Sequence, residues 1–529
     1  MPFTRRQLLA SGAATIATVG AATFFVSKKN NRASIISESN EFYVALPIPQ
    51  LLDARKLGNN IEFTAQMGMA EIVPHYLTPT YGYSSPYLGP VIRVYRGDAV
   101  NMKITNGLDK VTTVHWHGLF VPSELDGGPY GSIDPGQVWQ PTLPINQPAS
   151  TAWFHPHPHG DTARQVYMGL AGLIYVEDGS TNDLGLPDRY GLDDLPIILQ
   201  DRFFSAEGDM IYDGSPMAVL HGSRGNTIIV NGVYAPVAEV PKSVVRLRFL
   251  NGANARNFRL AFNDGRPMHV IANDNGFIAN SVSVSELTIA PGERYEILVD
   301  FSNGEVGVLL TYPDRSGRPA TGFSDQASKI MNDISDILTP IMRFDPVDNI
   351  SVVTRGIPTK LVDLPAPNAP DGIRRRSFIL DSMIATNMPL TGVTNSMEGM
   401  DHSQMGGSMG MDEKSGLAIG MKMGINGKTF DATRIDAEMK LGDKEIWELR
   451  GTEMAHPFHI HGASFRVLNL DGAAPPAHQT GQKDTVLVNE WAQLLVSFDQ
   501  PADPSKPFMF HCHILEHEDA GMMAQYVTV

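Results

Sequence analysis

Three widely separated stretches of the chain repeat one pattern, in which apolar and polar residues alternate. They are residues 95–106, 243–251 and 441–449. Such alternation is typical of antiparallel strands with one buried face. The first two stretches are followed by a Pro-Gly turn that leads into a further strand, and the third by the apolar run 491–498. In a chain of 529 residues, repetition at this scale predicts an all-β fold of three sandwich domains in series.

Changes of composition mark the expected domain boundaries. Residues 177–195 are polar and rich in Gly and Asp, and residues 359–376 are rich in Pro. We place the boundaries near residues 180 and 365. The expected parts are an N-terminal segment (1–40), domain 1 (41–180), domain 2 (181–365) and domain 3 (366–529).

Charge and cysteine content exclude two classes of protein. The chain has 41 basic and 57 acidic residues, a net charge of −16, so we expect no nucleic-acid partner. Cys512 is the single cysteine, so no intramolecular disulfide can form. A lone cysteine is most simply a small buried hydrophobic residue, but its neighbours point to a different role.

The N-terminus resembles a twin-arginine export signal. Thr4-Arg5-Arg6-Gln7-Leu8-Leu9 opens an apolar run to residue 26 that is rich in Ala, Gly and Thr. The alternative is an uncleaved membrane anchor, because the run is nearly long enough to span a bilayer. We expect a periplasmic monomer that the twin-arginine machinery exports.

Ten of the sixteen histidines lie in four clusters, two near each end of the chain. The clusters are His115-Trp116-His117, His155-Pro156-His157, His456-Pro457-Phe458-His459-Ile460-His461, and His511-Cys512-His513 with His517. Residues i and i+2 of a strand face the same way, so each His-x-His pair presents two imidazoles together. One pair could be a satisfied core pair. Burying four pairs without a ligand would cost several kcal/mol, so the clusters predict metal sites.

The last cluster predicts two linked metal centres. Alternation sends His511 and His513 to one face and Cys512 to the other. A cysteine thiolate with His456, His517 and a weak axial sulfur from Met522 is the ligand set of a blue copper centre. A zinc site would need a closed tetrahedral set and would leave the other pairs unused.

These four clusters resemble the copper-binding motifs of the three-domain multicopper oxidases, a family that includes the laccases, from about residue 45 to the end. The resemblance implies three cupredoxin-like Greek-key sandwiches, with domain 2 a structural spacer. It implies four copper ions, namely one type 1, one type 2 and a binuclear type 3 pair, with dioxygen as the electron acceptor.

The resemblance also assigns the ligands by motif position. Type 1 copper falls to His456, Cys512, His517 and Met522, and type 2 copper to His115 and His459. The type 3 pair falls to His117, His155, His157, His461, His511 and His513.

Three further residues near these motifs have two interpretations each. Asp126 and Glu518 match family positions that relay protons, although Asp126 lies in a turn sequence and Glu518 is placed to orient a ligand histidine. His159 is the third histidine of its run, and we interpret it as an outer or surface residue.

Nine methionines between residues 383 and 423 indicate the reducing substrate. Thioether sulfur prefers cuprous ion, and Glu398-Gly399-Met400-Asp401-His402 resembles the Met-rich insert of bacterial copper-efflux oxidases. We expect a loop at residues 395–416. The resemblance implies a substrate copper near Met454, with Met383 or Met388 as partners. That subfamily has an acidic residue where Thr452 stands, so the carboxylate is left unassigned between this position and Glu453.

Three functions compete. The first is a periplasmic cuprous oxidase that confers copper tolerance and also acts on phenols. The second is a laccase-like oxidase of organic substrates, with the Met-rich loop as a shield. The third is a copper-storing or cell-division protein on the same scaffold; relatives of that kind lose copper ligands, whereas this chain keeps them.

Overall fold

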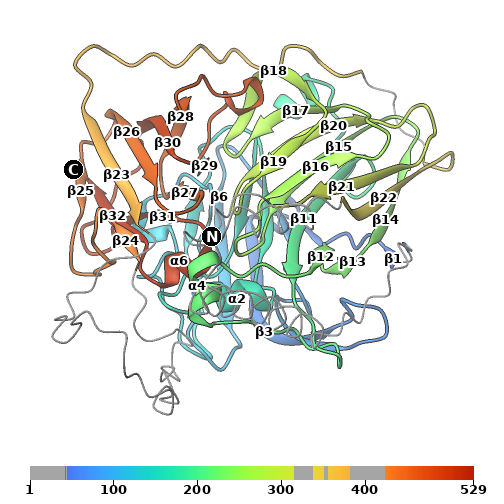
Figure 1. Cartoon of the computed structure of the whole chain (residues 1–529), viewed down its shortest axis with the longest axis horizontal. Coiled ribbons are helices and arrows are strands. Elements are labelled where there is room, and N and C mark those ends of the chain that lie inside the picture. The colour runs from blue at the N-terminus through green and yellow to red at the C-terminus, as the bar shows by residue number, and fades with distance from the viewer. Residues whose placement is uncertain (1–41, 43, 315–337, 351–355, 382–422) are drawn as a thin grey trace, which may run out of the picture.

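The computed structural model describes residues 42, 44–314, 338–350, 356–381 and 423–529. Three β-sandwiches follow one another along the chain, and Figure 1 shows them as blue to cyan, green to yellow, and orange to red ribbons. The prediction of an all-β fold is confirmed, because strands from three pairs of sheets far outnumber the few short helices in these residues. The export-signal segment and residues 395–416 lie outside the described residues.

The first sandwich has a sheet of order β4-β3-β6-β7, with β8 also on β6, and a sheet of order β2-β5-β10-β9. Apolar side chains of both sheets share one core. The strands are β2 (Leu51–Asp53), β3 (Asn60–Ala70), β4 (Thr78–Tyr83), β5 (Val91–Tyr95), β6 (Ala99–Asn106), β7 (Val138–Trp139), β8 (Thr142–Pro144), β9 (Ser150–Phe154) and β10 (Gly172–Glu177).

The second sandwich has sheets of order β1-β14-β22-β21-β16-β19 and β13-β12-β11-β15-β20-β17-β18. The strands are β1 (Val44–Ala45), β11 (Asp194–Arg202), β12 (Thr227–Val230), β13 (Val233–Tyr234), β14 (Pro236–Pro241), β15 (Val244–Asn251), β16 (Phe258–Phe262), β17 (Met268–Asn273), β18 (Gly276–Val284), β19 (Leu287–Ile289), β20 (Arg294–Asp300), β21 (Gly307–Tyr312) and β22 (Thr339–Val347). β1 precedes the first sandwich in sequence but pairs with β14 of the second.

The third sandwich has sheets of order β24-β23-β26-β30-β28 and β25-β32-β31-β27-β29. The strands are β23 (Arg375–Asp381), β24 (Gly424–Ile425), β25 (Ala437–Met439), β26 (Lys444–Gly451), β27 (His456–Ile460), β28 (Ser464–Leu470), β29 (Thr485–Val488), β30 (Trp491–Ser497), β31 (Phe508–Cys512) and β32 (Met523–Thr528). Its core includes Cys512, Met454 and Met522.

Short helices from all three domains meet near the middle of the molecule. α6 of domain 3 contacts both α2 of domain 1 and α4 of domain 2 (Figure 1). The helices are η1 (Arg55–Leu57), η2 (Ser123–Leu125), α2 (Thr162–Met168), α3 (Ser180–Asp183), α4 (Pro216–His221), η4 (Ala477–Gln479) and α6 (Leu515–Asp519). Within the described ranges, none of them has the length and apolar character needed to span a bilayer.

The three alternating stretches are strands, but the expectation of purely antiparallel pairing is wrong. β6, β15 and β26 each have antiparallel neighbours on one side and a parallel neighbour, β3, β11 or β23, on the other. Parallel neighbours need a long crossover connection. Here the chain supplies it by visiting the second sheet of the same sandwich between the two strands.

The expectation of one buried face also differs between the stretches. β6 alternates exposed and buried residues as predicted, whereas every residue of β15 is buried. Its charged residues are paired at the boundary with domain 1: Arg246 with Glu296, and Arg248 with Asp194. The alternating polar positions of β15 therefore belong to a domain interface rather than to solvent.

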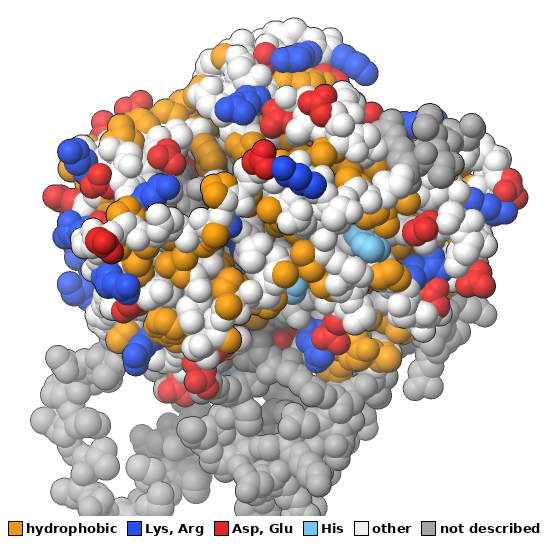
Figure 2. Space-filling model, turned by 90° about the horizontal axis from the view of Figure 1, so that it is seen from above, with side chains coloured by type: hydrophobic (Ala, Val, Ile, Leu, Met, Phe, Trp, Pro, Cys, Tyr) orange, Lys and Arg blue, Asp and Glu red, His pale blue; other side chains and the backbone are white. Residues whose placement is uncertain are grey.

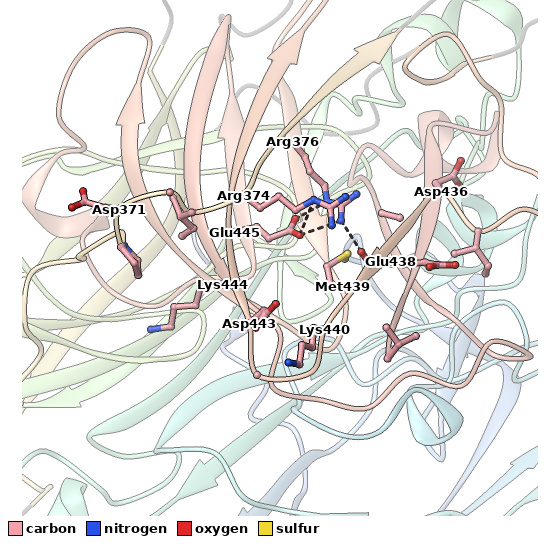
Figure 3. Close-up of a pocket in the computed structure, with 17 residues that line it drawn as sticks. Asp371, Arg374, Arg376, Asp436, Glu438, Met439, Lys440, Asp443, Lys444 and Glu445 are labelled. Atoms are coloured by element: carbon pink, nitrogen blue, oxygen red, sulfur yellow. Dashed lines mark hydrogen bonds and ion pairs between the residues drawn. The ribbon is translucent and has the colours of Figure 1, made fainter.

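The surface carries both signs of charge. On the face in Figure 2, basic and acidic side chains are interspersed among hydrophobic ones. A pocket of about 1010 Å³ opens beside β23, β25 and β26 of domain 3, where Arg374 and Arg376 point toward Glu445 (Figure 3). None of the residues that line it is a predicted copper ligand.

Candidate metal centre

Cys512 and two histidines meet in the interior of domain 3. Cys512 ends β31, His456 begins β27 and His517 lies in α6. The sulfur of Cys512 is 3.4 Å from Nδ1 of His456 and 3.7 Å from Nδ1 of His517. All three side chains are fully buried, so the structure brings together the residues predicted for type 1 copper.

Backbone carbonyls hold the outer nitrogens of these two histidines. Nε2 of His456 donates to the carbonyl of Thr452 (2.9 Å), and Nε2 of His517 donates to the carbonyl of Leu220 in α4 (3.1 Å). A carbonyl can only accept, so each ring carries its proton on Nε2 and turns the lone pair of Nδ1 toward the sulfur. Burial lowers the pKa of His456 to about 4, which keeps the ring neutral at pH 7.

Two further features complete the surroundings of the Cys512 sulfur. The amide of Ile514 donates to it at 3.4 Å, and Met522 is buried in the same apolar cluster as Cys512. Burial raises the pKa of the Cys512 thiol. A metal cation would offset that effect, because thiolate is the form that binds metal.

Eight more histidines form one cluster between domains 1 and 3. Nε2 of His511 lies 3.2 Å from Nε2 of His461 and 3.4 Å from Nε2 of His157. His513 lies against His117 and His155, with ring centroids 5.1 and 5.5 Å apart. His115 and His459, predicted for type 2 copper, have ring centroids 5.9 Å apart. Each predicted group of ligands therefore comes together.

Most of the rings, His513 excepted, share one arrangement: one nitrogen is held from outside and the other faces the cluster. The outer nitrogens of His115, His155, His459 and His511 contact backbone carbonyls of Asp126, Pro156, Asp484 and Cys512 at 2.9–3.0 Å. The nitrogens without a hydrogen-bond partner among the described residues include His115 Nε2, His155 Nε2, His459 Nε2, His117 Nδ1 and both nitrogens of His513.

Unpartnered buried nitrogens are costly. Burial lowers the pKa of His155 and His513 well below the ordinary value, and that of His461 to about 3. Neutral imidazoles that turn lone pairs toward a common space are good copper ligands. The residues present therefore fit bound copper.

Cys512 connects the two groups of side chains through the backbone. Its sulfur faces His456 and His517, while the rings of His511 and His513 face the interdomain cluster. The predicted alternation at this position is confirmed.

The two predicted proton-relay residues both contact ligand histidines. Oδ2 of Asp126 is 2.8 Å from Nδ1 of His461. The oxygens of Glu518 lie 3.2 Å from Nδ1 of His157 and 3.3 Å from Nδ1 of His511, and burial raises the pKa of this carboxyl well above its ordinary value. Their relay role stays a prediction. His159 packs its ring on Phe430, 5.0 Å between centroids, outside the cluster.

The predicted substrate-copper residues are only partly described. Met383 and Met388 lie outside the described residues. Met454 is 4% exposed and lies in a turn just before His456. Glu453 is exposed and has a left-handed backbone (φ 65°), so no carboxylate of this turn is assigned to the substrate.

Sequence reasoning missed Asp484, Thr485 and Arg294. Oδ1 of Asp484 is 3.1 Å from Nε2 of His117, and the hydroxyl of Thr485 is 3.2 Å from both His117 Nε2 and His459 Nδ1. Arg294 holds the Asp484 carboxylate from domain 2. Domain 2 also supplies the carbonyl of Leu220, so it contacts both centres and is more than a spacer.

Comparison with known proteins supports this arrangement. Family models described as multicopper oxidase match residues 64–181, 197–310 and 395–529. The cell division protein FtsP of Escherichia coli is 35% identical over 91% of this chain and 92% of its own length. The multicopper oxidase mco of Staphylococcus haemolyticus is 34% identical over 90% of this chain and 91% of its own.

Solved structures show the same fold. The laccase-like multicopper oxidase CueO of an Ochrobactrum species, described as having oxidase activity towards lignin model compounds and lignosulfonate, is 47% identical, with a TM-score of 0.79 over 92% of this chain and all of its own. The laccase of Pediococcus acidilactici is 32% identical, with a TM-score of 0.74 over 92% of this chain and 94% of its own. With both groups of predicted ligands brought together and three domains matched, this chain belongs to the multicopper oxidase family as a three-domain, laccase-like member.

Proposed function

We propose that this chain oxidises cuprous ion and passes the electrons to dioxygen, which is reduced to water. The observation that carries the proposal is the position of Cys512, whose sulfur faces one group of ligands while its two sequence neighbours face the other. A few covalent bonds then connect the site of electron entry with the site of dioxygen reduction.

The proposal includes four copper ions. His456, Cys512, His517 and Met522 would hold type 1 copper, His115 and His459 type 2 copper, and the other six clustered histidines the type 3 pair. Bound copper supplies one-electron oxidation at the first site and multi-electron reduction of dioxygen at the other three.

The protein itself supplies protons and excludes water. Glu518 is 1% exposed and lies beside His157 and His511, and burial raises the pKa of its carboxyl well above the ordinary value, which favours the protonated form. Asp126 stays ionised, because contacts with His115 and His461 outweigh burial and lower the pKa of its carboxyl. We assign delivery of protons to Glu518 and orientation of His461 to Asp126.

Three observations support cuprous ion as the electron donor. Nine methionines lie between residues 383 and 423, and thioether sulfur prefers cuprous ion. Met454 precedes a type 1 ligand by two residues. Carbonyls of Thr452 and Leu220 cover the outer nitrogens of both type 1 histidines, so a phenol hydroxyl has no ring N–H to bind.

Oxygen uptake by the copper-loaded protein tests the proposal. We expect an intense absorption band at about 600 nm from the Cys512 site. We also expect oxygen uptake to be faster with cuprous ion than with a phenol. A protein with the band but with uptake only on phenols would contradict the cuprous assignment. A copper-loaded protein without the band would contradict the oxidase assignment altogether.

A second candidate is an oxidase of organic substrates, favoured by the lignin-model activity of the 47% identical relative. Deletion of residues 395–416 separates the two. If cuprous ion is the substrate, its oxidation falls while phenol oxidation persists or rises, with the 600 nm band as the control for an intact type 1 site. Equal loss of both activities would contradict a cuprous-specific role for the segment.

The cellular role is also a proposal. The twin-arginine motif at residues 4–9 supports export to the periplasm, where oxidation of cuprous ion would confer copper tolerance, and we propose a monomer. The 35% identity to FtsP supports a cell-division role instead. Copper sensitivity of a deletion strain, set against its filamentation, distinguishes the two roles.

A further inference from the structure

Arg294 lies at the point where the three domains meet. It begins β20 of domain 2 and is 0% exposed. All five of its side-chain N–H groups have acceptors. They donate to the carbonyls of Thr151 (3.0 Å), Gly292 (2.9 Å) and Asp274 (3.2 Å), and to both carboxylate oxygens of Asp484 (2.7 and 2.6 Å). Thr151 belongs to domain 1 and Asp484 to domain 3.

Asp484 connects this guanidinium to the histidine cluster. Its Oδ1 atom, 2.7 Å from the guanidinium, is also 3.1 Å from Nε2 of His117. Its backbone carbonyl accepts from Nδ1 of His459 at 2.9 Å. One residue therefore holds the outer nitrogens of two rings that stack with centroids 3.6 Å apart.

The protons on these outer nitrogens decide which ring atoms face the copper site. With Nε2 of His117 and Nδ1 of His459 donating, the lone pairs lie on His117 Nδ1 and His459 Nε2, neither of which has a hydrogen-bond partner within the described structure. His117 is a predicted type 3 ligand and His459 a predicted type 2 ligand. His117 therefore depends on the position of the Asp484 carboxylate, and His459 on the position of the Asp484 backbone.

The surroundings fix Arg294 in place. Asp274 accepts from its backbone amide (2.8 Å) and forms an ion pair with Lys483 (3.0 Å), which also contacts Glu293 (3.1 Å). Gly118, which follows His117 and has φ 89°, leaves room for the guanidinium, because a Cβ there would lie 2.4 Å from Nη2 of Arg294.

We infer that Arg294 of domain 2 is a positioning residue for the trinuclear copper centre, acting through Asp484 on His117 and His459. The inference rests on the proposed copper-binding function. It gives domain 2 a direct part in assembling a centre whose ligands all come from the other two domains.

A simpler alternative is that Arg294 only joins the domains. Arg248 provides a matched control, because it is 1% exposed, lies on the neighbouring strand β15 and pairs with Asp194 at 2.8 and 2.9 Å. Within the described structure, its hydrogen-bond and ion-pair partners include Thr151 of domain 1, which Arg294 also contacts, but no histidine. Loss of Arg248 should weaken domain packing without disturbing the cluster.

The experiment compares Arg294→Met, Arg294→Lys and Arg248→Met with the parent after loading with cupric ion. Copper retained against excess EDTA and the type 2 EPR signal report the trinuclear centre, and the 600 nm band reports type 1. We expect Arg294→Met to hold trinuclear copper about 10- to 100-fold more weakly while keeping the band. Arg294→Lys should fall between it and the parent, and Arg248→Met should match the parent.

Three outcomes would overturn the inference. The first is that Arg294→Met keeps the parent's type 2 EPR signal and its resistance to EDTA. The second is that Arg248→Met loses as much trinuclear copper as Arg294→Met. The third applies should Arg294→Met fail to fold, and it is that Arg294→Lys retains copper as well as the parent. A parent that binds no copper contradicts the proposed function instead. In that case 15N NMR of the metal-free protein still tests positioning: the His117 and His459 tautomers should change in Arg294→Lys and not in Arg248→Met.

Discussion

At the scale of single residues, position within a strand decides what each ligand can reach. Cys512 is the last residue of β31, with His511 before it in the strand and His513 just beyond. Because successive side chains of a strand point to opposite faces, one tripeptide faces both groups of predicted ligands. No helix or turn would separate the three side chains in this way.

Replacing the thiol separates the two centres experimentally. In Cys512→Ser we expect the 600 nm band to disappear, because a hydroxyl cannot supply the soft thiolate ligand. The type 2 EPR signal should remain, since the rings of His511 and His513 face the other way. Cuprous oxidation should fall by at least 100-fold, which oxygen uptake measures. A persisting band would contradict the assignment of Cys512.

Sequence patterns predicted the histidines that the structure brings together, because the pairing signal is local, two residues apart. They did not identify Asp484, because an isolated acidic residue before a strand has no distinctive spacing. Arg294 is 190 residues from Asp484 along the chain, and single-sequence periodicity carries no information on such a contact. Residues that hold ligands from outside are thus harder to predict than the ligands themselves.

At the scale of elements, the strands were predictable and their partners were not. The alternation of residues 95–106 marks β6 and the end of β5, but nothing in it distinguishes a parallel neighbour from an antiparallel one. α4 was not predicted at all. Its six residues are too few for a helical period to stand out, yet its Leu220 carbonyl contacts His517.

The packing of α4 can be tested at its C-cap, Gly222. A Cβ there would lie 2.2 Å from Cβ of Ala255 and 2.7 Å from Ile514, and φ is 72°. We expect Gly222→Ala to lower the free energy of unfolding by about 1–3 kcal/mol and to shift the 600 nm band, because α4 would move relative to His517. Thermal melting and absorption spectra measure both effects.

Gly265 is the control for this variant, because it has the same φ of 72° but open space where the Cβ would go. Gly265→Ala should lose stability through backbone strain alone and leave the band in place. An unshifted band in Gly222→Ala would show that α4 does not position His517.

The β15–β20 strand pair gives a pH prediction. Burial alone would raise the pKa of Glu296, but Arg246 and Arg248 lower it from 4.5 to about 2. A carboxyl whose pKa is lower in the folded state stabilises the protein at every pH above its unfolded-state pKa. For Glu296 this stabilisation is roughly 3 kcal/mol, and it is lost as the pH falls from about 4.5 to about 2.

In Glu296→Gln this part of the acid dependence should be missing, whereas replacement of the exposed Glu438 by Gln should retain it. Denaturant unfolding at several pH values measures the difference. Parallel acid profiles for the parent and Glu296→Gln would contradict the assigned charge pairing.

At the scale of the whole molecule, the number and order of the domains followed from repetition and cluster positions. Domain 2 was expected to be a spacer, but its Leu220 carbonyl contacts His517 and its Arg294 contacts Asp484, which in turn contacts His117. Interdomain contacts of this kind depend on tertiary packing, and the sequence of domain 2 contains no ligand motif from which they could be predicted. The predicted boundaries near residues 180 and 365 stay predictions.

Copper removal should weaken the association of domains 1 and 3. Ligands from both domains share the histidine cluster, so a bound metal stabilises only the assembled form, by about 4 kcal/mol when free metal is 1,000-fold above its dissociation constant. We expect the chelated protein to melt several degrees lower, and calorimetry to show recovery when copper is restored. Identical melting curves would contradict an interdomain metal centre.

The order of ligands along the chain also constrains biosynthesis. His115 emerges from the ribosome early, but its partners in the cluster include His511 and His513, close to residue 529. A nascent or truncated polypeptide therefore cannot hold the complete set of metal ions. Under the proposed function, an interrupted translation product that lacks His511 and His513 could not reduce dioxygen.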